Sequence, residues 1–174
     1  MKRLESKRVV VTQASTFMGP AITEVFDEEG AILMADDRDL TQIDAAKNLI
    51  TEAGQVDVLI VNLAAMPPRS SVADTADDLW SEMFDVMVHP LHRLVRAVLP
   101  QMIERRQGKI IVMGSMSARR GMPDRSAYSA ARGAQLAYVQ AVGVEVAPHN
   151  VQVTAVAPGF VEHPSYFPPE DLET

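Results

Sequence analysis

The chain has 174 residues, of which 47% are apolar and 22% are charged, which is the composition of one soluble globular domain. It carries 16 Lys+Arg against 23 Asp+Glu, a formal net charge of −7, so neither nucleic acid nor a membrane is an expected partner. There is no Cys, no apolar run of the ~18 residues that a spanning helix needs, and no signal-peptide stretch, so we expect a cytoplasmic protein without disulfides.

Five short runs rich in β-branched residues are predicted to be strands, with longer amphipathic stretches between them. The runs cover residues 8–11, 31–34, 56–61, 109–112 and 151–156. Their alternation with helical stretches predicts a doubly wound parallel sheet, Rossmann-like, in a three-layer α/β/α arrangement. Ligands of such sheets lie beyond the carboxyl ends of the strands. We therefore expect the functional residues after Val11, Asp36, Asn62, Ser115 and Pro158.

The predicted helices have recognisable ends. Gly30, Gly54 and Gly108 are placed as C-terminal caps would be, and Pro148 stands where a later helix should stop.

A long helix is predicted over residues 77–106, after a start at Thr75 that has the pattern of a capping box. Its apolar residues recur at helical spacing, which indicates core packing or a subunit interface. Pro90 lies inside it and removes one backbone donor, so the helix should kink there.

The turn from Thr12 to Pro20 joins the first strand to the first helix. In dinucleotide binders this turn is rich in Gly, because the backbone must approach a pyrophosphate closely. Here only Gly19 remains, and Gln13 and Phe17 take positions where Gly would be expected. A phenyl ring at position 17 would fill space that a cofactor needs, which argues against a tightly bound dinucleotide. The alternative is a degenerate nucleotide turn in which the Phe17 ring points away.

That alternative has candidate cofactor residues. Asp36 ends the second strand and would bind ribose hydroxyls, which favours NAD over NADP. Asn62 ends the third strand and would either support the nucleotide or bond to local backbone. Thr12 and Gly19 of the turn complete this set. No metal site is expected, because metal-ligand spacing is absent among the four histidines, His89, His92, His149 and His163.

Ser115, Tyr128 and Arg132 form the candidate catalytic set. Ser115 follows the fourth strand, and Tyr128 comes 13 residues later, near the start of the next helix. Arg132 is four residues beyond Tyr128, so both side chains share a helix face. A tyrosine is a poor base at neutral pH, but a nearby guanidinium favours its phenolate form. Ser115 can hydrogen-bond a substrate oxygen, so the three residues suit the transfer of a proton to or from a hydroxyl.

On these residues the chain resembles the short-chain dehydrogenases/reductases from about Lys7 to Pro168. The resemblance rests on Val-Asp-Val-Leu-Ile-Val-Asn at 56–62, on Ser115 with Tyr128, and on Ala-Pro-Gly-Phe at 157–160. It implies an NAD(P)-dependent oxidoreductase that acts on an alcohol or a ketone.

The chain departs from that family at positions that concern the cofactor or the hydride. The family has Lys where Arg132 stands, and glycines where Gln13 and Phe17 stand. Its Asn in the long helix aligns with Met87, and its Thr after Pro-Gly aligns near His163.

These departures make the chain similar to the halohydrin dehalogenases, a branch that lost the dinucleotide. Their turn motif, Thr-x4-Phe/Tyr-x-Gly, is met by Thr12, Phe17 and Gly19. Their catalytic motif, Ser-x12-Tyr-x3-Arg, is met by Ser115, Tyr128 and Arg132, and residues 163–168 resemble their halide-side loop.

This second resemblance implies a lyase that needs no redox cofactor. Ser115 would bind the hydroxyl oxygen of a vicinal haloalcohol, and Tyr128 would take its proton. The alkoxide would then displace the halide and close an epoxide; in reverse, small anions would open epoxides. The halide site would comprise the backbone at Pro158 and Gly159 with the rings of Phe17, Phe160 and Tyr166.

Two further expectations concern the whole protein. Both families imply a homo-oligomer, a dimer or a tetramer. The chain is also short for either family, because a helix and most of a strand after Arg38, and a final strand with its helices, are absent. We expect a single domain over residues 1–174. We also expect the sequence to be part of a longer protein, with a missing segment between residues 38 and 39, or else to be a natural truncation. A relative without catalytic activity is the third interpretation.

Overall fold

The computed structural model describes residues 2–63 and 65–161 of the chain. Its strands are β1 (Arg8–Thr12), β2 (Ile32–Asp36), β3 (Val58–Val61), β4 (Gly108–Met113) and β5 (Val151–Val156). Its helices are α1 (Gly19–Glu28), α2 (Ala45–Ala53), α3 (Asp77–Met87), α4 (His89–Glu104), α5 (Ser117–Arg120) and α6 (Ser126–Val146), with a short 3-10 turn over Ala147–His149.

The five strands form one parallel sheet in the order β2-β1-β3-β4-β5. All four residues of β3 are buried, which explains why its sequence is a continuous apolar run. The chain reverses its direction across the sheet between β1 and β3, where such folds place their ligands. The predicted doubly wound α/β fold is therefore confirmed.

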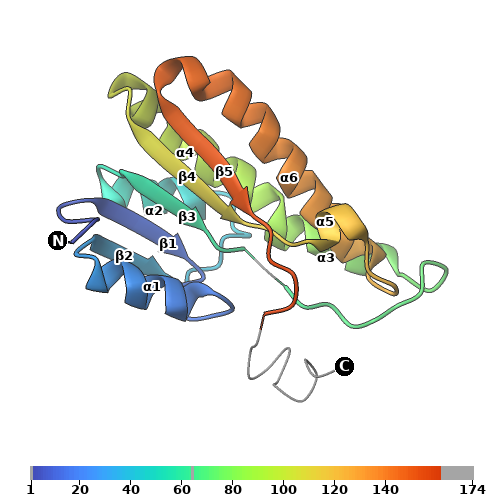
Figure 1. Cartoon of the computed structure of the whole chain (residues 1–174). Coiled ribbons are helices and arrows are strands. Elements are labelled where there is room, and N and C mark those ends of the chain that lie inside the picture. Colours follow the sequence, from blue (N-terminus) through green and yellow to red (C-terminus); the bar gives the residue numbers. More distant parts are fainter. Residues whose placement is uncertain (1, 64, 162–174) are drawn as a thin grey trace.

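Helices cover both faces of the sheet (Figure 1). On one face, Ile22 and Phe26 of α1 pack against Val9, Val11 and Ile60. On the other face, the largest core cluster joins the sheet to α2, α4 and α6, and it includes Leu49, Leu59, Leu94, Ile110 and Val142. Among the described residues, no helix combines the length and the apolar character that crossing a bilayer requires.

The predicted helix over residues 77–106 is in fact two helices. α3 ends at Met87 and α4 begins at His89, with Pro90 in the first turn of α4. The interruption lies at Val88, just before the expected kink at Pro90, and the Val88 backbone stays in the helical region at φ −101° and ψ −51°. The capping box is wrong, because Ala76 precedes α3 and no side chain caps it, while the Thr75 hydroxyl donates to the Ser71 carbonyl.

Gly108 is also not a helix cap. It begins β4, and the left-handed conformation after α4 is taken by Arg106, at a φ of 50°. A Cβ at position 108 would lie 2.4 Å from the side chain of Met102, so glycine is needed there for close packing. Gly30 and Gly54 do have positive φ values directly after α1 and α2, as predicted.

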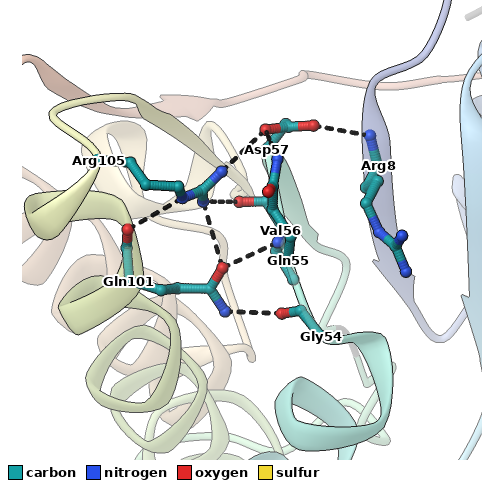
Figure 2. Close-up of polar contacts among 7 residues, drawn as sticks. All are labelled: Arg8, Gly54, Gln55, Val56, Asp57, Gln101 and Arg105. Carbon is teal, nitrogen blue, oxygen red and sulfur yellow. Dashed lines mark hydrogen bonds and ion pairs between the residues drawn. The ribbon is translucent and has the colours of Figure 1, made fainter.

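A partly buried polar cluster ties the carboxyl end of α4 to the amino ends of the central strands (Figure 2). Arg105 donates to Asp57 at 3.1 Å and to the Val56 carbonyl at 2.7 Å. The side-chain oxygen of Gln101 accepts from the Val56 N–H at 2.9 Å, and Asp57 accepts from the Arg8 N–H at 2.9 Å. This cluster lies at the sheet edge opposite to the carboxyl ends, so we assign it to stability.

Replacing Asp57 by Asn is expected to destabilise the protein in a pH-dependent way. Burial alone would raise the pKa of Asp57, but hydrogen bonds from Arg8, Gln55 and Arg105 hold it below its ordinary 3.8. A carboxyl with a lowered pKa stabilises the fold above its unfolded-state pKa, and this contribution is lost as the pH falls through the folded-state pKa. Urea unfolding should therefore show a loss of about 2 kcal/mol near neutral pH.

The same measurement below about pH 3.8 should give a smaller difference between Asp57→Asn and the wild type. The control is Asp27→Asn, which removes an exposed carboxyl on α1. An equal effect of Asp57→Asn at both pH values would contradict the role given to the charge.

Candidate active site

The ends of β1 and β3 are joined side by side at the carboxyl edge of the sheet. The Thr12 hydroxyl donates to the Asn62 carbonyl at 3.2 Å and accepts from the Asn62 N–H at 3.0 Å. Both residues are buried. The sequence analysis placed Thr12 and Asn62 in one site, and the structure brings them together through bonds to each other.

The turn after β1 is held from two sides. The Asn62 side-chain amide donates to the carbonyls of Gln13 and Thr16, at 2.9 and 3.0 Å. From the other side, one Asp37 carboxylate oxygen accepts from the N–H and the hydroxyl of Ser15, at 2.8 and 2.9 Å. Asn62 thus bonds to local backbone, which is one of the two roles considered for it. The Ser15 N–H of the turn is thus already bonded to the Asp37 carboxylate.

Two residues of this turn hold backbone conformations that glycine adopts most easily. Gln13 has a φ of 45° and Phe17 a φ of 52°. The left-handed conformation costs a residue with a side chain about 1–2 kcal/mol. Gly19 begins α1, and a Cβ there would lie 2.3 Å from the Gln13 carbonyl oxygen. The turn keeps the shape of a glycine-rich loop at positions 13 and 17 without the glycines.

Asp36, the candidate ribose ligand, already has a partner. Its two carboxylate oxygens accept from the backbone N–H of Arg38 at 3.1 Å and from the Arg38 Nε at 2.7 Å. Arg38 also forms an ion pair with Glu52 on α2. Asp36 therefore fixes the exit of β2 through Arg38.

Ser115 lies in the loop after β4 and is oriented by a residue that the sequence analysis missed. Its Oγ accepts from the Ser117 N–H at 3.2 Å and from the Ser117 hydroxyl at 3.0 Å. Because these two bonds use the acceptor capacity of Ser115 Oγ, its own proton is left to donate to a substrate oxygen. The i,i+2 spacing of two serines after a strand was the available signal.

Tyr128 and Arg132 meet on α6 as their spacing predicted, but in a different geometry. The Arg132 guanidinium carbon lies 5.1 Å from the centroid of the Tyr128 ring, over its face. The ring packs in a small core cluster with Met83 and Met87 of α3 and Ala131 of α6. The positive charge is held beside the phenol by a cation–π contact.

Arg132 is almost fully buried, with 4% of its surface exposed, and to the described residues it donates three hydrogen bonds from Nη1. It donates to the carbonyls of Leu63 and Met113 at 2.9 and 2.8 Å. These carbonyls lie at the ends of β3 and β4, so Arg132 fixes α6 to the carboxyl edge of the sheet.

Gln135 is a second residue that sequence reasoning missed. Its side-chain oxygen accepts from Arg132 Nη1 at 2.9 Å, and its amide nitrogen donates to the Met87 carbonyl at 2.8 Å. Gln135 thereby holds Arg132 and also pairs a carbonyl at the break between α3 and α4. A polar residue three positions after Arg132, on an otherwise apolar face, was the signal.

The predicted halide-side residues are only partly described. The Pro158 carbonyl accepts from the Met116 N–H at 2.9 Å, which places this segment beside the Ser115 loop. Gly159 follows, and Phe160 is 69% exposed. Tyr166 lies outside the described residues. Within residues 2–63 and 65–161, no group of three or more His, Cys, Asp or Glu side chains is placed to bind a metal ion.

A family model and a curated relative both point to the same protein family. The model of the family described as short chain dehydrogenase matches residues 7–167. A curated 3-oxoacyl-[acyl-carrier-protein] reductase from Vibrio harveyi is 32% identical over 155 residues, which cover 88% of this chain and 63% of the reductase.

Two solved structures share the fold. An NAD+-bound xylitol dehydrogenase matches with a TM-score of 0.86 and 24% identity, over 93% of this chain and 73% of that one. A structure described as a dehalogenation enzyme matches with a TM-score of 0.84 and 24% identity, over 99% of this chain and 80% of that one. The name of the curated relative, a reductase, is that of an oxidoreductase.

Proposed function

Because this chain belongs to the short-chain dehydrogenase family, we propose that it uses the family's Ser and Tyr positions for proton transfer at a substrate hydroxyl. In this proposal it is a halohydrin dehalogenase-like lyase, which converts vicinal haloalcohols to epoxides and halide without a redox cofactor. The catalytic residues are Ser115, Tyr128 and Arg132.

The turn after β1 is the observation that carries the proposal, because its residues do not suit the diphosphate of a dinucleotide. The Asp37 carboxylate accepts from the Ser15 N–H, so a negative charge already occupies one backbone donor of this turn and would repel a diphosphate. Gln13 and Phe17 add side chains at left-handed positions of the same turn. Tyr128 and Arg132 can still transfer a proton to or from a substrate when no nicotinamide cofactor is bound.

The proposed reaction balances without any redox partner. Ser115 donates a hydrogen bond to the hydroxyl oxygen of the substrate, while the Tyr128 phenolate takes the hydroxyl proton. The new alkoxide oxygen attacks the neighbouring carbon, so a C–O bond forms as the C–halogen bond breaks with its electron pair. The halide leaves toward the segment that begins at Pro158, whose carbonyl lies 2.9 Å from the Met116 N–H. The Arg132 guanidinium lies over the face of the Tyr128 ring and holds the ring in place for this proton transfer.

An NAD(P)-dependent oxidoreductase that acts on an alcohol or a ketone is the second candidate. The relatives favour it, since a curated relative is a reductase and a solved structure of the same fold is bound to NAD+. The ion pair of Asp36 with Arg38 and the occupied Ser15 N–H favour the lyase instead.

A single preparation separates the two candidates. We expect calorimetric titration with NADH and NADPH to detect no binding, and we expect halide release from a vicinal chloro- or bromoalcohol in the absence of nucleotide. Asp37→Ala should raise the affinity for either nucleotide about tenfold or more, because it removes a negative charge from the turn after β1. Tight nucleotide binding by the wild type, together with nucleotide-dependent alcohol turnover, would establish the oxidoreductase instead.

A further inference from the structure

Arg125 lies directly before α6 and is not used by the proposed reaction. It precedes Tyr128 by three residues and Ser129 by four, so the three side chains belong to one stripe of the helix. The backbone of Arg125 pairs with Ser70 in an isolated β-bridge, and the Ser70 N–H donates to the Asp124 carbonyl at 3.0 Å. This bridge brings Arg69, the neighbour of Ser70, to the same place.

Two polar atoms of this stripe are buried without a partner. In the part of the chain that the structure describes, neither Nη1 of Arg125 nor Oγ of Ser129 has a hydrogen bond. A buried donor of a charged group that lacks a partner is costly, and a bound ligand that accepts from it would remove that cost.

The local charge is also uncompensated. Burial and the charge of Arg69 lower the pKa of Arg125, and Tyr128 opposes that shift, so all three groups lie within electrostatic reach. Among the described residues, no carboxylate forms an ion pair with Arg69 or Arg125. Two further exposed arginines, Arg119 and Arg120, end α5, the short helix that packs against α6. On a chain of net charge −7, this is an unusual concentration of positive charge beside a candidate base.

We propose that the substrate carries a carboxylate, which binds to the guanidinium of Arg125 with support from Arg69 and the Ser129 hydroxyl, while its hydroxyl lies at Ser115 and Tyr128. This inference rests on the proposed function, since it assigns the substrate class of the same site. Arginine suits the role because its planar fork matches a carboxylate with two parallel hydrogen bonds.

Binding of an unreactive hydroxycarboxylate, β-hydroxybutyrate, tests the proposal without any turnover. Calorimetry should show that wild-type protein binds it at least about tenfold more tightly than its neutral amide. Arg125→Gln should remove this preference, and Arg125→Lys should restore part of it. The control Arg96→Gln removes an exposed charge from α4 and should leave the preference unchanged. Thermal unfolding of each variant shows whether it is folded. If Arg125→Gln does not fold, Arg69→Gln is the second variant, and it should lose a smaller part of the preference for the acid.

Equal binding of acid and amide by the wild type, or an unchanged preference in both Arg125→Gln and Arg69→Gln, would overturn the proposal. So would inorganic sulfate that competes as well as β-hydroxybutyrate, since the site would then take a free anion.

Turnover separates this inference from the proposed function. Halide release should be faster from a vicinal chlorohydrin that carries a carboxylate than from the matched amide, and Arg125→Gln should reduce that ratio. If neither chlorohydrin releases halide but carboxylate binding depends on Arg125, the lyase is wrong and the carboxylate site stands. If both release halide equally in wild type and variant, the lyase stands and the carboxylate site is wrong.

Discussion

Replacing Tyr128 by Phe is expected to reduce halide release from a vicinal haloalcohol by a factor of about 10² to 10⁴, the usual contribution of a positioned base. The variant loses only the phenol oxygen. Its ring keeps its place in the cluster with Met83, Met87 and Ala131, so the fold should be preserved. Initial rates of halide release, measured without nucleotide, give the effect directly.

Tyr138→Phe is the matched control for this experiment. Tyr138 lies on the same helix, where its ring contacts His92 edge to face, away from the Ser115 loop. We expect its activity to equal that of the wild type. A Tyr128→Phe variant that retains wild-type halide release would falsify the role of Tyr128 as the base.

Replacing Arg132 by Met should cost both activity and stability. The change removes the charge beside the Tyr128 ring and leaves the carbonyls of Leu63 and Met113 and the oxygen of Gln135 without their donor. Buried hydrogen bonds to a charged group are worth about 1.5–3 kcal/mol each. We expect the free energy of unfolding to fall by about 3 kcal/mol and halide release to fall by at least about 10².

Two variants separate these effects. Arg132→Lys restores the charge but not the planar guanidinium, so it should recover part of the activity. Gln135→Leu keeps the Arg132 bonds to Leu63 and Met113, so its loss of stability should be smaller than that of Arg132→Met. If Arg132→Met is destabilised but releases halide at the wild-type rate, Arg132 has a structural role alone.

The positions of the strands were predictable because buried parallel strands need continuous apolar runs, but their first residues were not. Val56 is apolar and fully buried, yet it precedes β3, because its N–H and carbonyl bond to the side chains of Gln101 and Arg105. Those partners lie near the carboxyl end of α4 and directly after it, more than forty residues away. Local sequence cannot reveal such a competition for backbone hydrogen bonds.

For the candidate site, the residues could be predicted from the sequence, but the orientation of their side chains could not. The four-residue spacing places Arg132 beside Tyr128, but the direction of its guanidinium depends on carbonyls at the ends of β3 and β4 and on Gln135. Likewise, the missing glycines at positions 13 and 17 were visible in the sequence, whereas the bond from Ser15 to Asp37 was not. Contacts between distant segments decide these details.

The left-handed backbone at Gln13 and Phe17 suggests an unusual route for redesign. Installing a new binding site normally sacrifices stability, because new function requires groups that the fold does not favour. Glycine at both positions would release about 1–2 kcal/mol of strain each, against a smaller entropic cost in the unfolded chain. The same two substitutions would also remove the interactions that the Gln13 and Phe17 side chains make, so the melting temperature of the double variant measures whether backbone strain or side-chain contact has the larger effect in this turn.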